Sequence, residues 1–376
     1  MCTDTQCIES YDKTGARHHF HLHAPHRHSI FCILPPDVLD NISKNGSSEQ
    51  RAAAQETLST DQTIRLMRAT SDAMLGGVKR GFSLATPGQK ARTIFNAHNT
   101  QNLPGDVVRN EGGKPTGEPA TDEAYDGLGA TFDLYWKVFE RNSIDDEGLH
   151  LNATVHFGVK YDNAFWNGER MVFGDGDGQL FNRFTISVDV IGHELTHGVT
   201  QDEAQLVYFL QPGALNESMS DVFGSLVKQY ALKQTAKKAD WLIGAGLLAK
   251  GVNGVALRSM KAPGTAYDDK VLGKDPQPAH MKNYVRTLKD NGGVHINSGI
   301  PNHAFYLLAI NLSGHALEKA GRIWYDTLRD PSLRPTSGFT SFAKRTALNA
   351  SRLYGEKSVE KKAVIDAWNQ VGIKTV

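Results

Sequence analysis

The residues with the clearest chemical meaning form the run His193-Glu194-Leu195-Thr196-His197, which has the pattern H-E-x-x-H. On a helix, side chains four positions apart share one face, with Cβ atoms about 5–6 Å apart. Two imidazoles placed in this way can bind one zinc ion at about 2.0–2.1 Å. Glu194 would lie beside the ion, where its carboxylate can take a proton from zinc-bound water. Because the same pattern also arises by chance on ordinary helices, the run alone only suggests a hydrolytic zinc site.

A catalytic zinc site needs a third protein ligand and one open coordination position. Glu217 is the strongest candidate, because it follows His197 by 20 residues in the run GALNESMSD (213–221). Asp221 falls four residues later on the same helical face, and its carboxylate can accept the outer N–H of a ligand histidine. Without the upstream histidines these acids would be interpreted as a solvated helix face. Together they complete a set of two histidines, one glutamate and a supporting carboxylate.

Apolar side chains at helical spacing predict the elements that carry these residues. Helices are predicted near 187–200 and 214–232, around the two parts of the site. The chain then stays mostly helical, with further helices near 302–312, 316–328, 339–353 and 358–370.

The part before residue 187 has more β-forming sequence, in ARTIFNA (91–97) and LNATVHFGVKY (151–161). Between them an amphipathic helix is predicted, with Asp122 as its N-cap and an apolar face formed by Ala124, Leu128, Phe132, Tyr135 and Phe139. The predicted fold class is therefore α+β, with a β-rich first lobe and a helical second lobe.

The overall composition is that of a packed protein with more than one structural unit, with 376 residues, 40% of them hydrophobic and 22% charged. Lys+Arg and Asp+Glu both number 41, so the charge indicates no nucleic-acid or membrane partner. No apolar run has the length of a secretory signal or a membrane span. Cys2, Cys7 and Cys32 all lie near the start, so the main body can form no disulfide and does not indicate a redox compartment.

The order and spacing of the motifs resembles the thermolysin family of metallopeptidases. The resemblance runs from about Ile94 to the C-terminus and rests on YDNAFWNGERMVFGDGDG (161–178), HELTH (193–197), GALNESMSD (213–221) and DNGGVHINSG (290–299). It implies a two-lobe thermolysin-like fold with the zinc helix between the lobes. It also implies a zinc-dependent neutral endopeptidase that acts on proteins and peptides.

Residue by residue, the resemblance implies that His193, His197 and Glu217 bind zinc, that Glu194 is the general base and that Asp221 supports a ligand histidine. It further implies that Tyr208 and His295 stabilise the oxyanion and that Asp290 orients His295. Substrate-binding roles fall on Asn163 and Ala164 for the peptide backbone, Arg258 for a substrate carbonyl, and Phe181, Phe184, Val190 and Leu257 for a pocket. Two aromatic and two aliphatic side chains predict cleavage on the N-terminal side of bulky hydrophobic residues.

The resemblance implies that the double calcium site of better-known family members is degraded here, with calcium binding still possible, since its positions correspond to Asp189, Lys228, Asp240, Leu242 and Ala245. Calcium prefers six to eight oxygen ligands, and only two carboxylates remain. We expect the Lys228 ammonium to bridge Asp189 and Asp240 in place of calcium. GDGDG (174–178) lacks the glutamate that ends an EF-hand loop, and we interpret it as a structural turn rather than a calcium loop.

The predicted organisation is a His-rich disordered tail (1–30), a short inhibitory propeptide and linker (31–75), a β-rich catalytic lobe that includes the HELTH helix (76–200), and a helical lobe (201–376). Within the front part, a short helix is predicted after Pro35-Pro36 up to Asn45-Gly46, a polar helix from Ser48 to Met67, and an exposed linker over 70–90. The PPDVL segment resembles the short propeptides of the protealysin-like branch of the family.

We hypothesise that Cys32–Leu39 lies in the cleft and that self-cleavage within 60–80 frees the enzyme. Cys32 either binds zinc as a thiolate or packs as a small apolar residue on the cleft wall, and packing is favoured. The six histidines between His18 and His28 belong either to the disordered tail or to a metal-capture tract of no defined geometry.

Two other functions compete with peptidase activity. A non-enzymatic zinc-binding or peptide-binding protein of the same fold would be expected to lose Glu194 or His295 first, and both are present. A metal-storage role of the tail would leave the whole body unexplained. We expect a monomer that is secreted by a route without a recognisable signal peptide, with cytoplasmic residence as the alternative.

Overall fold

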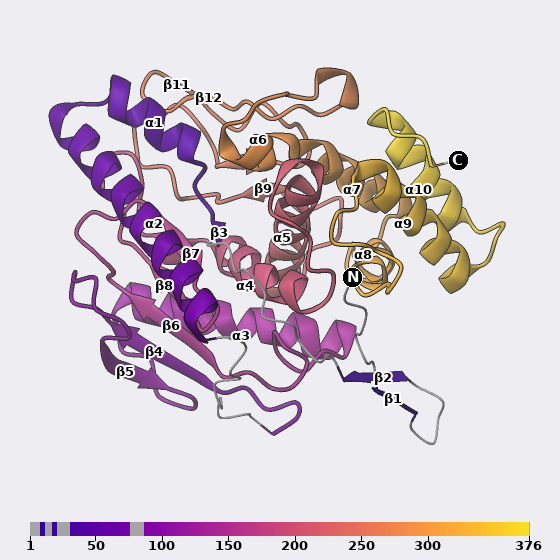
Figure 1. Cartoon of the computed structure of the whole chain (residues 1–376), viewed down its shortest axis with the longest axis horizontal. Coiled ribbons are helices and arrows are strands. Elements are labelled where there is room, and N and C mark those ends of the chain that lie inside the picture. Colours follow the sequence, from indigo (N-terminus) through magenta and orange to yellow (C-terminus); the bar gives the residue numbers. More distant parts are fainter. Residues whose placement is uncertain (1–7, 12–16, 21–30, 76–85, 376) are drawn as a thin grey trace.

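The computed structural model describes residues 8–11, 17–20, 31–75 and 86–375. Figure 1 shows a β-rich N-terminal lobe and a helical C-terminal lobe, with helix α4 (Val188–Asp202) between them. This arrangement confirms the predicted α+β class and the two-lobe thermolysin-like fold.

The N-terminal lobe contains a six-stranded mixed sheet with the strand order β3-β7-β8-β6-β4-β5. Strands β4, β6 and β8 run parallel, and the other neighbours are antiparallel. The strands are β3 (Phe31–Cys32), β4 (Arg92–Asn96), β5 (Asp106–Asn110), β6 (Leu151–Val155), β7 (Ala164–Trp166) and β8 (Arg170–Phe173). Both segments predicted to be β-rich therefore contribute strands, and the front segment adds an edge strand to β7.

Helix α3 (Pro119–Phe139) packs beside this sheet, as its amphipathic spacing predicts. The predicted N-cap is wrong, because the helix begins at Pro119 and is capped by Glu118, whose carboxylate accepts from the N–H groups of Ala120 and Thr121. Proline suits the first helical position, where no N–H is needed. Asp122 lies inside the first turn and pairs with Arg109 at 2.8 Å.

After β3, the front segment forms helices α1 (Pro36–Asn45) and α2 (Ser48–Leu75), which lie along the left of the molecule in Figure 1. The helix after Pro35 is confirmed. The polar helix begins where predicted but continues to Leu75, so the predicted exposed linker over 70–90 is wrong for its first residues. Residues 76–85 of that linker lie outside the described residues.

Part of the predicted disordered tail has regular structure. Strands β1 (Ile8–Tyr11) and β2 (Arg17–Phe20) pair in antiparallel fashion. The rest of residues 1–30, including the histidines from His21 onward, lies outside the described residues.

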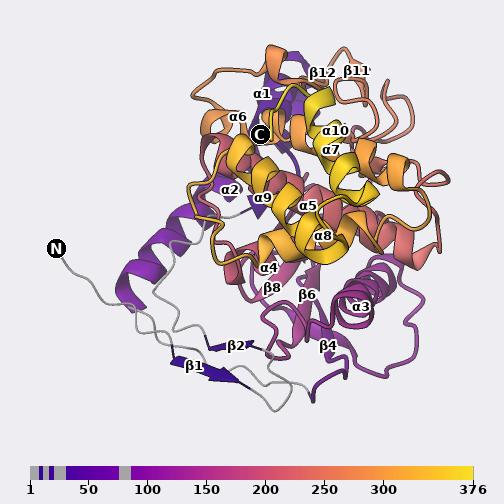
Figure 2. The same cartoon turned by 90° about the vertical axis from the view of Figure 1, so that its right-hand side faces the viewer.

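The C-terminal lobe is built from helices that Figure 2 shows packed side by side. They are α5 (Leu210–Ala231), α6 (Asp290–Asn297), α7 (Gly299–Leu312), α8 (Ala320–Leu328), α9 (Phe339–Tyr354) and α10 (Val359–Gln370). All except α6 were predicted. Positive φ angles from Asp290 to Gly293 interrupt α6, so the sequence shows no helical periodicity there. Short strands β9 (Leu242–Ile243), β10 (Arg258–Ser259), β11 (Asp268–Asp269) and β12 (Gly273–Lys274) lie between α5 and α6.

Helices α4 and α5 pack closely because glycines lie at their contact. A Cβ on Gly224 of α5 would lie 2.3 Å from the backbone oxygen of Asp189 on α4. A Cβ on Gly192 of α4 would lie 3.1 Å from the Cα of Gly224. This close approach brings the polar faces of the two helices together in the interior of the protein.

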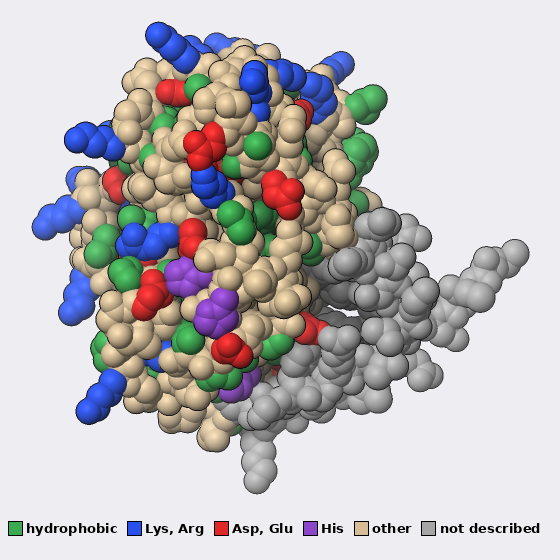
Figure 3. Space-filling view, turned by 90° about the vertical axis from the view of Figure 1, so that its left-hand side faces the viewer, with side chains coloured by type: hydrophobic (Ala, Val, Ile, Leu, Met, Phe, Trp, Pro, Cys, Tyr) green, Lys and Arg blue, Asp and Glu red, His purple; other side chains and the backbone are tan. Residues whose placement is uncertain are grey.

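On the face shown in Figure 3, basic, acidic and histidine side chains of the described residues are interspersed, and neither sign forms a continuous patch. This agrees with the equal numbers of basic and acidic residues. Within the part of the chain that the structure describes, no helix is both long and apolar enough to span a bilayer.

Candidate active site

Three predicted metal ligands come together between α4 and α5. His193, His197 and Glu217 are fully buried, and one potential ligand atom from each lies within 4.8 Å of the others. The two Nε2 atoms are 3.1 Å apart, and Glu217 lies 3.6 Å from His193 and 3.4 Å from His197.

The outer nitrogen of each histidine is held by a buried acceptor. Nδ1 of His193 donates to Asp221 at 2.8 Å, and Nδ1 of His197 donates to Asn216 at 2.8 Å. These bonds leave both Nε2 lone pairs directed at the same point. Burial and repulsion from His193 lower the pKa of His197 well below its usual range, so its imidazole is neutral, as a metal ligand must be.

The three residues fit a zinc ion. Ligand atoms at tetrahedral angles, each about 2.0–2.1 Å from zinc, would be about 3.3–3.4 Å apart. The observed separations of 3.1–3.6 Å bracket this value. Oε2 of Glu217 is buried and has no hydrogen-bond partner among the described residues, as expected for an atom that binds a cation.

The Glu194 carboxylate lies beside this group on α4. Its Oε2 accepts the Trp166 N–H of β7 at 3.2 Å, and its Oε1 is buried without a hydrogen-bond partner in the described part of the chain. Burial and repulsion from Glu217 raise the pKa of Glu194 well above its usual range. A carboxylate with raised proton affinity suits a group that accepts a proton and then returns it.

Tyr208 and His295 lie on the other side of Glu217. The Tyr208 hydroxyl donates to Glu217 Oε1 and lies 3.2 Å from Nε2 of His295. Asp290 accepts from Nδ1 of His295 at 2.6 Å and from its backbone N–H at 2.8 Å. Although burial acts in the opposite direction, Asp290 and Glu217 raise the pKa of His295 to about 9, so the ring carries a proton on Nε2 at neutral pH.

The predicted peptide-binding residues face the same space. Arg258 on β10 makes two hydrogen bonds of 2.8 Å to Asp221. Although burial acts in the opposite direction, Arg258 and His193 hold the pKa of Asp221 well below its usual range, so it remains a carboxylate. Asn163 precedes β7 and Ala164 begins it, so both lie beside β3, the strand of the front segment that pairs with β7.

The predicted pocket residues Phe181, Phe184, Val190 and Leu257 are all buried and belong to the main hydrophobic cluster, which runs through both lobes. The rings of Phe181 and Phe184 have centroids 5.9 Å apart, and Leu257 directly precedes Arg258. The cluster also contains Ile33 and Leu34 of the front segment, both almost completely buried.

The front segment crosses the site as an extended strand. Cys32 accepts from His295 Nε2 through its backbone oxygen at 3.1 Å, and Ile33 accepts from Arg258 Nη1 at 3.0 Å. The Ile33 N–H donates to Ala164 O at 3.3 Å, and the Leu34 N–H donates to Asn163 Oδ1 at 3.1 Å.

The Cys32 side chain packs in a small apolar cluster with Phe157, Tyr161, Phe165 and Val172. Its sulfur is not part of the potential metal group formed by the described residues. These contacts support packing on the cleft wall over a thiolate bound to zinc.

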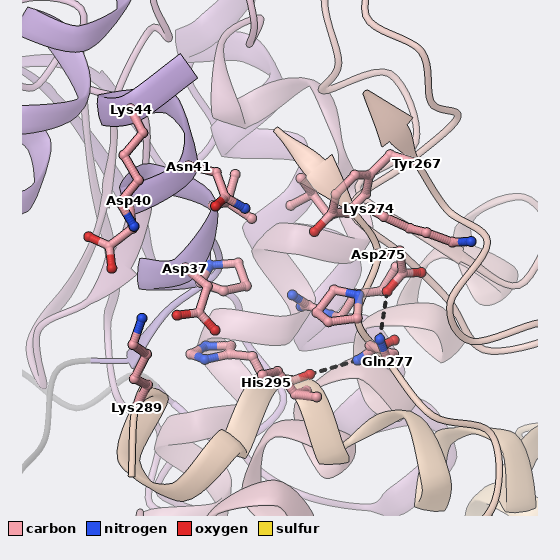
Figure 4. A pocket seen from close by; sticks show the side chains of 16 residues that line it. Asp37, Asp40, Asn41, Lys44, Tyr267, Lys274, Asp275, Gln277, Lys289 and His295 are labelled. Atoms are coloured by element: carbon pink, nitrogen blue, oxygen red, sulfur yellow. Dashed lines mark hydrogen bonds between the residues drawn. The ribbon is translucent and has the colours of Figure 1, made fainter. Parts of the chain in front are cut away.

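A cavity of about 270 Å³ continues the site beyond Pro35, between α1 and the C-terminal lobe (Figure 4). The Asp37 side chain of α1 points towards His295 and Lys289. Burial and repulsion from Asp290 raise the pKa of Asp37.

Lys228 makes the bridge that the sequence predicts. Its ammonium lies 3.1 Å from Asp189 and 2.8 Å from Asp240, and it donates to the backbone oxygen of Leu242 at 3.3 Å. Although burial acts in the opposite direction, the two carboxylates raise the pKa of Lys228.

The GDGDG run has the contacts of a structural turn. Asp177 Oδ1 accepts from the N–H groups of Gln179, Leu180 and Phe181, which fixes the chain before the predicted pocket. Asp175 pairs with His156 at 2.9 Å.

Sequence reasoning missed three contacts of the site. Asn216 orients His197, Trp166 donates to Glu194, and Asn302 Nδ2 donates to Asp221 at 2.8 Å. Asn216 could have been noticed, because it directly precedes a predicted ligand on a predicted helix. Trp166 acts through its backbone and Asn302 comes from a distant helix, so neither has a local sequence signal.

Comparison with known proteins agrees with this geometry. The family model of the thermolysin metallopeptidase catalytic domain matches residues 53–201, and that of the thermolysin metallopeptidase alpha-helical domain matches residues 204–373. An extracellular metalloprotease of Pectobacterium carotovorum subsp. carotovorum is 54% identical over 345 residues, which cover 92% of this chain and 97% of the relative. Protease PrtS of Photorhabdus sp. (strain Az29) is 52% identical over 346 residues, which cover 91% of this chain and 92% of the relative.

Among solved structures, the precursor of protealysin, a metalloproteinase from Serratia proteamaculans, has a TM-score of 0.83 and 55% sequence identity. The match covers 91% of this chain and 99% of that one. The resemblance inferred from the motifs is therefore confirmed. The chain belongs to the thermolysin family of metallopeptidases and is a metalloendopeptidase.

Proposed function

We propose that this chain is the precursor of a zinc-dependent neutral endopeptidase that cleaves before bulky hydrophobic residues and is inhibited by its own front segment. The observation that carries the proposal is the buried group of His193, His197 and Glu217 with Glu194 beside it. The presence of Glu194 and His295 in bonded positions argues against a catalytically silent binding protein.

In the proposed mechanism, His193, His197 and Glu217 would hold zinc, and the ion would supply the Lewis acidity that activates water and polarises the peptide carbonyl. Glu194 takes a proton from the attacking water and returns it to the leaving nitrogen. Protonated His295 and the Tyr208 hydroxyl donate to the carbonyl oxygen as its negative charge grows, a type of contact worth about 3 kcal/mol. Asp290 keeps His295 protonated and oriented.

The proposed specificity rests on the apolar character of the predicted pocket. Phe181, Phe184, Val190 and Leu257 are all buried apolar side chains, so a charged side chain among them would lose its hydration without a partner. Arg258, Asn163 and Ala164 would hold the substrate backbone, as they hold the front segment. The test is a peptide library in which the residue directly after the cleaved bond is varied over all amino acids. A preference for charged residues at that position would contradict the proposal.

Self-inhibition is supported by the strand that occupies the proposed substrate position. Cys32 and Ile33 use the hydrogen-bonding groups of His295 and Arg258, so no other peptide can bind them at the same time. Helix α2 adds a second attachment, because buried Asp61 accepts from Tyr161 and Asn163. A relative with a solved structure is named as a precursor.

For activation, we propose self-cleavage after the inhibitory segment, within 60–80. Residues up to Leu75 are helical, and a protease cleft binds extended chain, so the cut requires α2 to open or falls after it. The proposed mature enzyme would be secreted, as the extracellular relative is named, and would act as a monomer.

The decisive experiment compares the full chain with its Glu194→Gln variant. We expect wild type to shorten by about 60–80 residues, a range set by the proposed cleavage site, and to gain peptidase activity that a zinc chelator abolishes. The variant should bind zinc but neither shorten nor cleave peptides. If both chains bind zinc and stay intact and inert even after a trace of active protease removes the front segment, the non-enzymatic alternative replaces this proposal.

A further inference from the structure

One peptide bond of the front segment lies between the proposed catalytic groups. The carbonyl oxygen of Cys32 accepts from His295 Nε2 at 3.1 Å. The nitrogen of the same bond belongs to Ile33, whose N–H donates to Ala164 O at 3.3 Å and lies near the Glu194 carboxylate. The bond thus faces the proposed oxyanion donor on its oxygen side and the proposed proton carrier on its nitrogen side.

The direction of the strand agrees with this position. Strand β3 runs antiparallel to β7, and the groups after the bond meet the proposed backbone-binding residues in order. Ile33 N–H meets Ala164, Ile33 C=O meets Arg258, and Leu34 N–H meets Asn163. A strand of opposite direction would place its donors and acceptors in reverse order and could not make this set.

The side chains agree as well. In an extended strand, neighbouring side chains point to opposite faces. Cys32 packs in the small cluster around Phe165, whereas Ile33 belongs to the main hydrophobic core, to which the proposed pocket residues also belong. A branched apolar residue therefore follows the bond, which is the type that the proposed pocket would prefer.

We infer that the bond between Cys32 and Ile33 is a second self-cleavage site, an inference that rests on the proposed function. Water adds its oxygen to the Cys32 carbonyl carbon, the C–N bond breaks, and both protons of the water go to the Ile33 nitrogen. The products are a carboxylate on Cys32 and an ammonium group on Ile33. The reaction needs no other reactant, and it separates residues 1–32, with the His-rich tract, from the rest of the chain.

Cleavage at this bond does not by itself release the inhibitory segment. Val38, Leu39 and Ile42 of α1 are buried against the body, and Thr57 of α2 accepts the Asp162 N–H at 3.1 Å. These contacts, together with that of Asp61, all lie after the cut. The shortened segment therefore stays in the cleft with Ile33 as its first residue, and the enzyme stays inactive until the second cut.

The test follows intact mass and N-terminal sequence of the full chain over time. We expect a product that begins at Ile33, formed at a rate that does not change over a tenfold dilution because the bond already lies in the chain's own site. Ile33→Leu should keep this product, since it preserves a bulky apolar side chain. Ile33→Gly should reduce it at least tenfold, and Glu194→Gln should abolish it.

A second measurement does not depend on catalysis. In the inert Glu194→Gln chain, hydrogen exchange at the Ile33 and Leu34 amides should be at least tenfold slower than in the same chain with Ile33→Gly. Fast exchange in both chains would overturn the inference, because the strand would then not be held in the cleft.

The outcomes also separate this inference from the proposed function. If the chain gains peptidase activity and loses its inhibitory segment, but no product begins at Ile33, the inference is wrong and the proposed function stands. The inference is also wrong, and the proposed function still stands, if the rate constant for forming this product rises in proportion to protein concentration, because one molecule would then be cutting another. If no bond is cut and no peptide is hydrolysed, both fail together.

Discussion

Arg258 is joined to Asp221 by two hydrogen bonds of 2.8 Å, from Nε to Oδ2 and from Nη2 to Oδ1. The same carboxylate accepts from His193 at 2.8 Å and from Asn302 at 2.8 Å. The remaining guanidinium nitrogen donates to the backbone oxygen of Ile33. The side chain that holds a bound strand is therefore coupled to the carboxylate that orients a candidate zinc ligand.

Replacing Arg258 by lysine should impair both functions, because an ammonium cannot make the two parallel bonds to Asp221. Losing such support typically weakens metal affinity or activity about 10–100-fold. We expect a loss of that size in kcat/KM and a weaker zinc affinity, measured by competition with a chelator. Arg352→Lys, at an exposed pair with Asp326, is the control and should change neither. Unchanged zinc affinity in Arg258→Lys would show that the coupling is absent.

Asp61→Ala should weaken self-inhibition. The buried Asp61 carboxylate accepts from Tyr161 and from Asn163 Nδ2, and its removal leaves buried donors without that acceptor. Such a loss costs about 1–3 kcal/mol, which corresponds to about 5–150-fold in the equilibrium between bound and released segment. The lag before peptide hydrolysis should shorten accordingly, while the mature enzyme keeps its kcat. Glu56→Ala, on an exposed position of the same helix, is the control, and an equal lag in both variants would contradict the role of Asp61.

Lys228→Met should destabilise the protein, because it leaves buried Asp189 without its cation. We expect the free energy of unfolding to fall by about 1–3 kcal/mol, less than for a fully buried pair since Asp240 is partly exposed. Urea unfolding of the Glu194→Gln precursor measures this without self-digestion. Wild type should show no stabilisation by millimolar calcium. A large calcium effect would mean that the ammonium does not replace the ion.

Asp162→Asn should remove a pH dependence of stability. Burial, followed by repulsion from Asp177, raises the pKa of Asp162 to about 8, whereas in the unfolded chain it is about 3.9. The folded state therefore binds the proton more tightly, and this carboxyl lowers stability as pH rises through that window, by up to about 1.4 kcal/mol per pH unit. The asparagine variant should match wild type at low pH and exceed its stability at pH 9. Parallel stability curves would contradict this assignment.

Cys32→Ala should leave the precursor as inactive as wild type. The sulfur packs among Phe157, Phe165 and Val172, while the backbone oxygen of Cys32 meets His295. The substitution removes one buried atom and is expected to cost about 1 kcal/mol of stability. Peptidase activity in the uncut variant would instead support the hypothesis that the Cys32 thiolate binds zinc and keeps the precursor inactive.

The local features of this protein could be predicted from the sequence. Residues four positions apart always lie on the same face of a helix. His193 and His197 therefore share a face wherever that helix is placed. Helical and β periodicity predicted the two lobes, and these predictions succeeded because each depends on spacing within short segments. The resemblance to the family's calcium positions predicted the ammonium bridge of Lys228 to Asp189 and Asp240, which the structure contains.

Predictions at segment ends were less accurate. Asp122 is not the N-cap of α3, because Glu118 and Pro119 begin the helix one turn earlier. Helix α2 extends past the predicted start of the linker, and α6 was missed because residues with positive φ hide its pattern. The helix propensities of neighbouring residues are too similar to identify where a helix begins or ends, whereas packing in the folded protein selects one position.

Only the tertiary structure decided which backbone groups meet across the cleft. The sequence determined that the chain holds a zinc-peptidase motif set and a short front segment that could block it. It could not show that Cys32 and Ile33 lie opposite His295 and Glu194, or that Asn302 reaches Asp221 from α7. Backbone N–H and C=O groups are the same in every residue, so their partners depend on strand register and helix packing rather than on residue type.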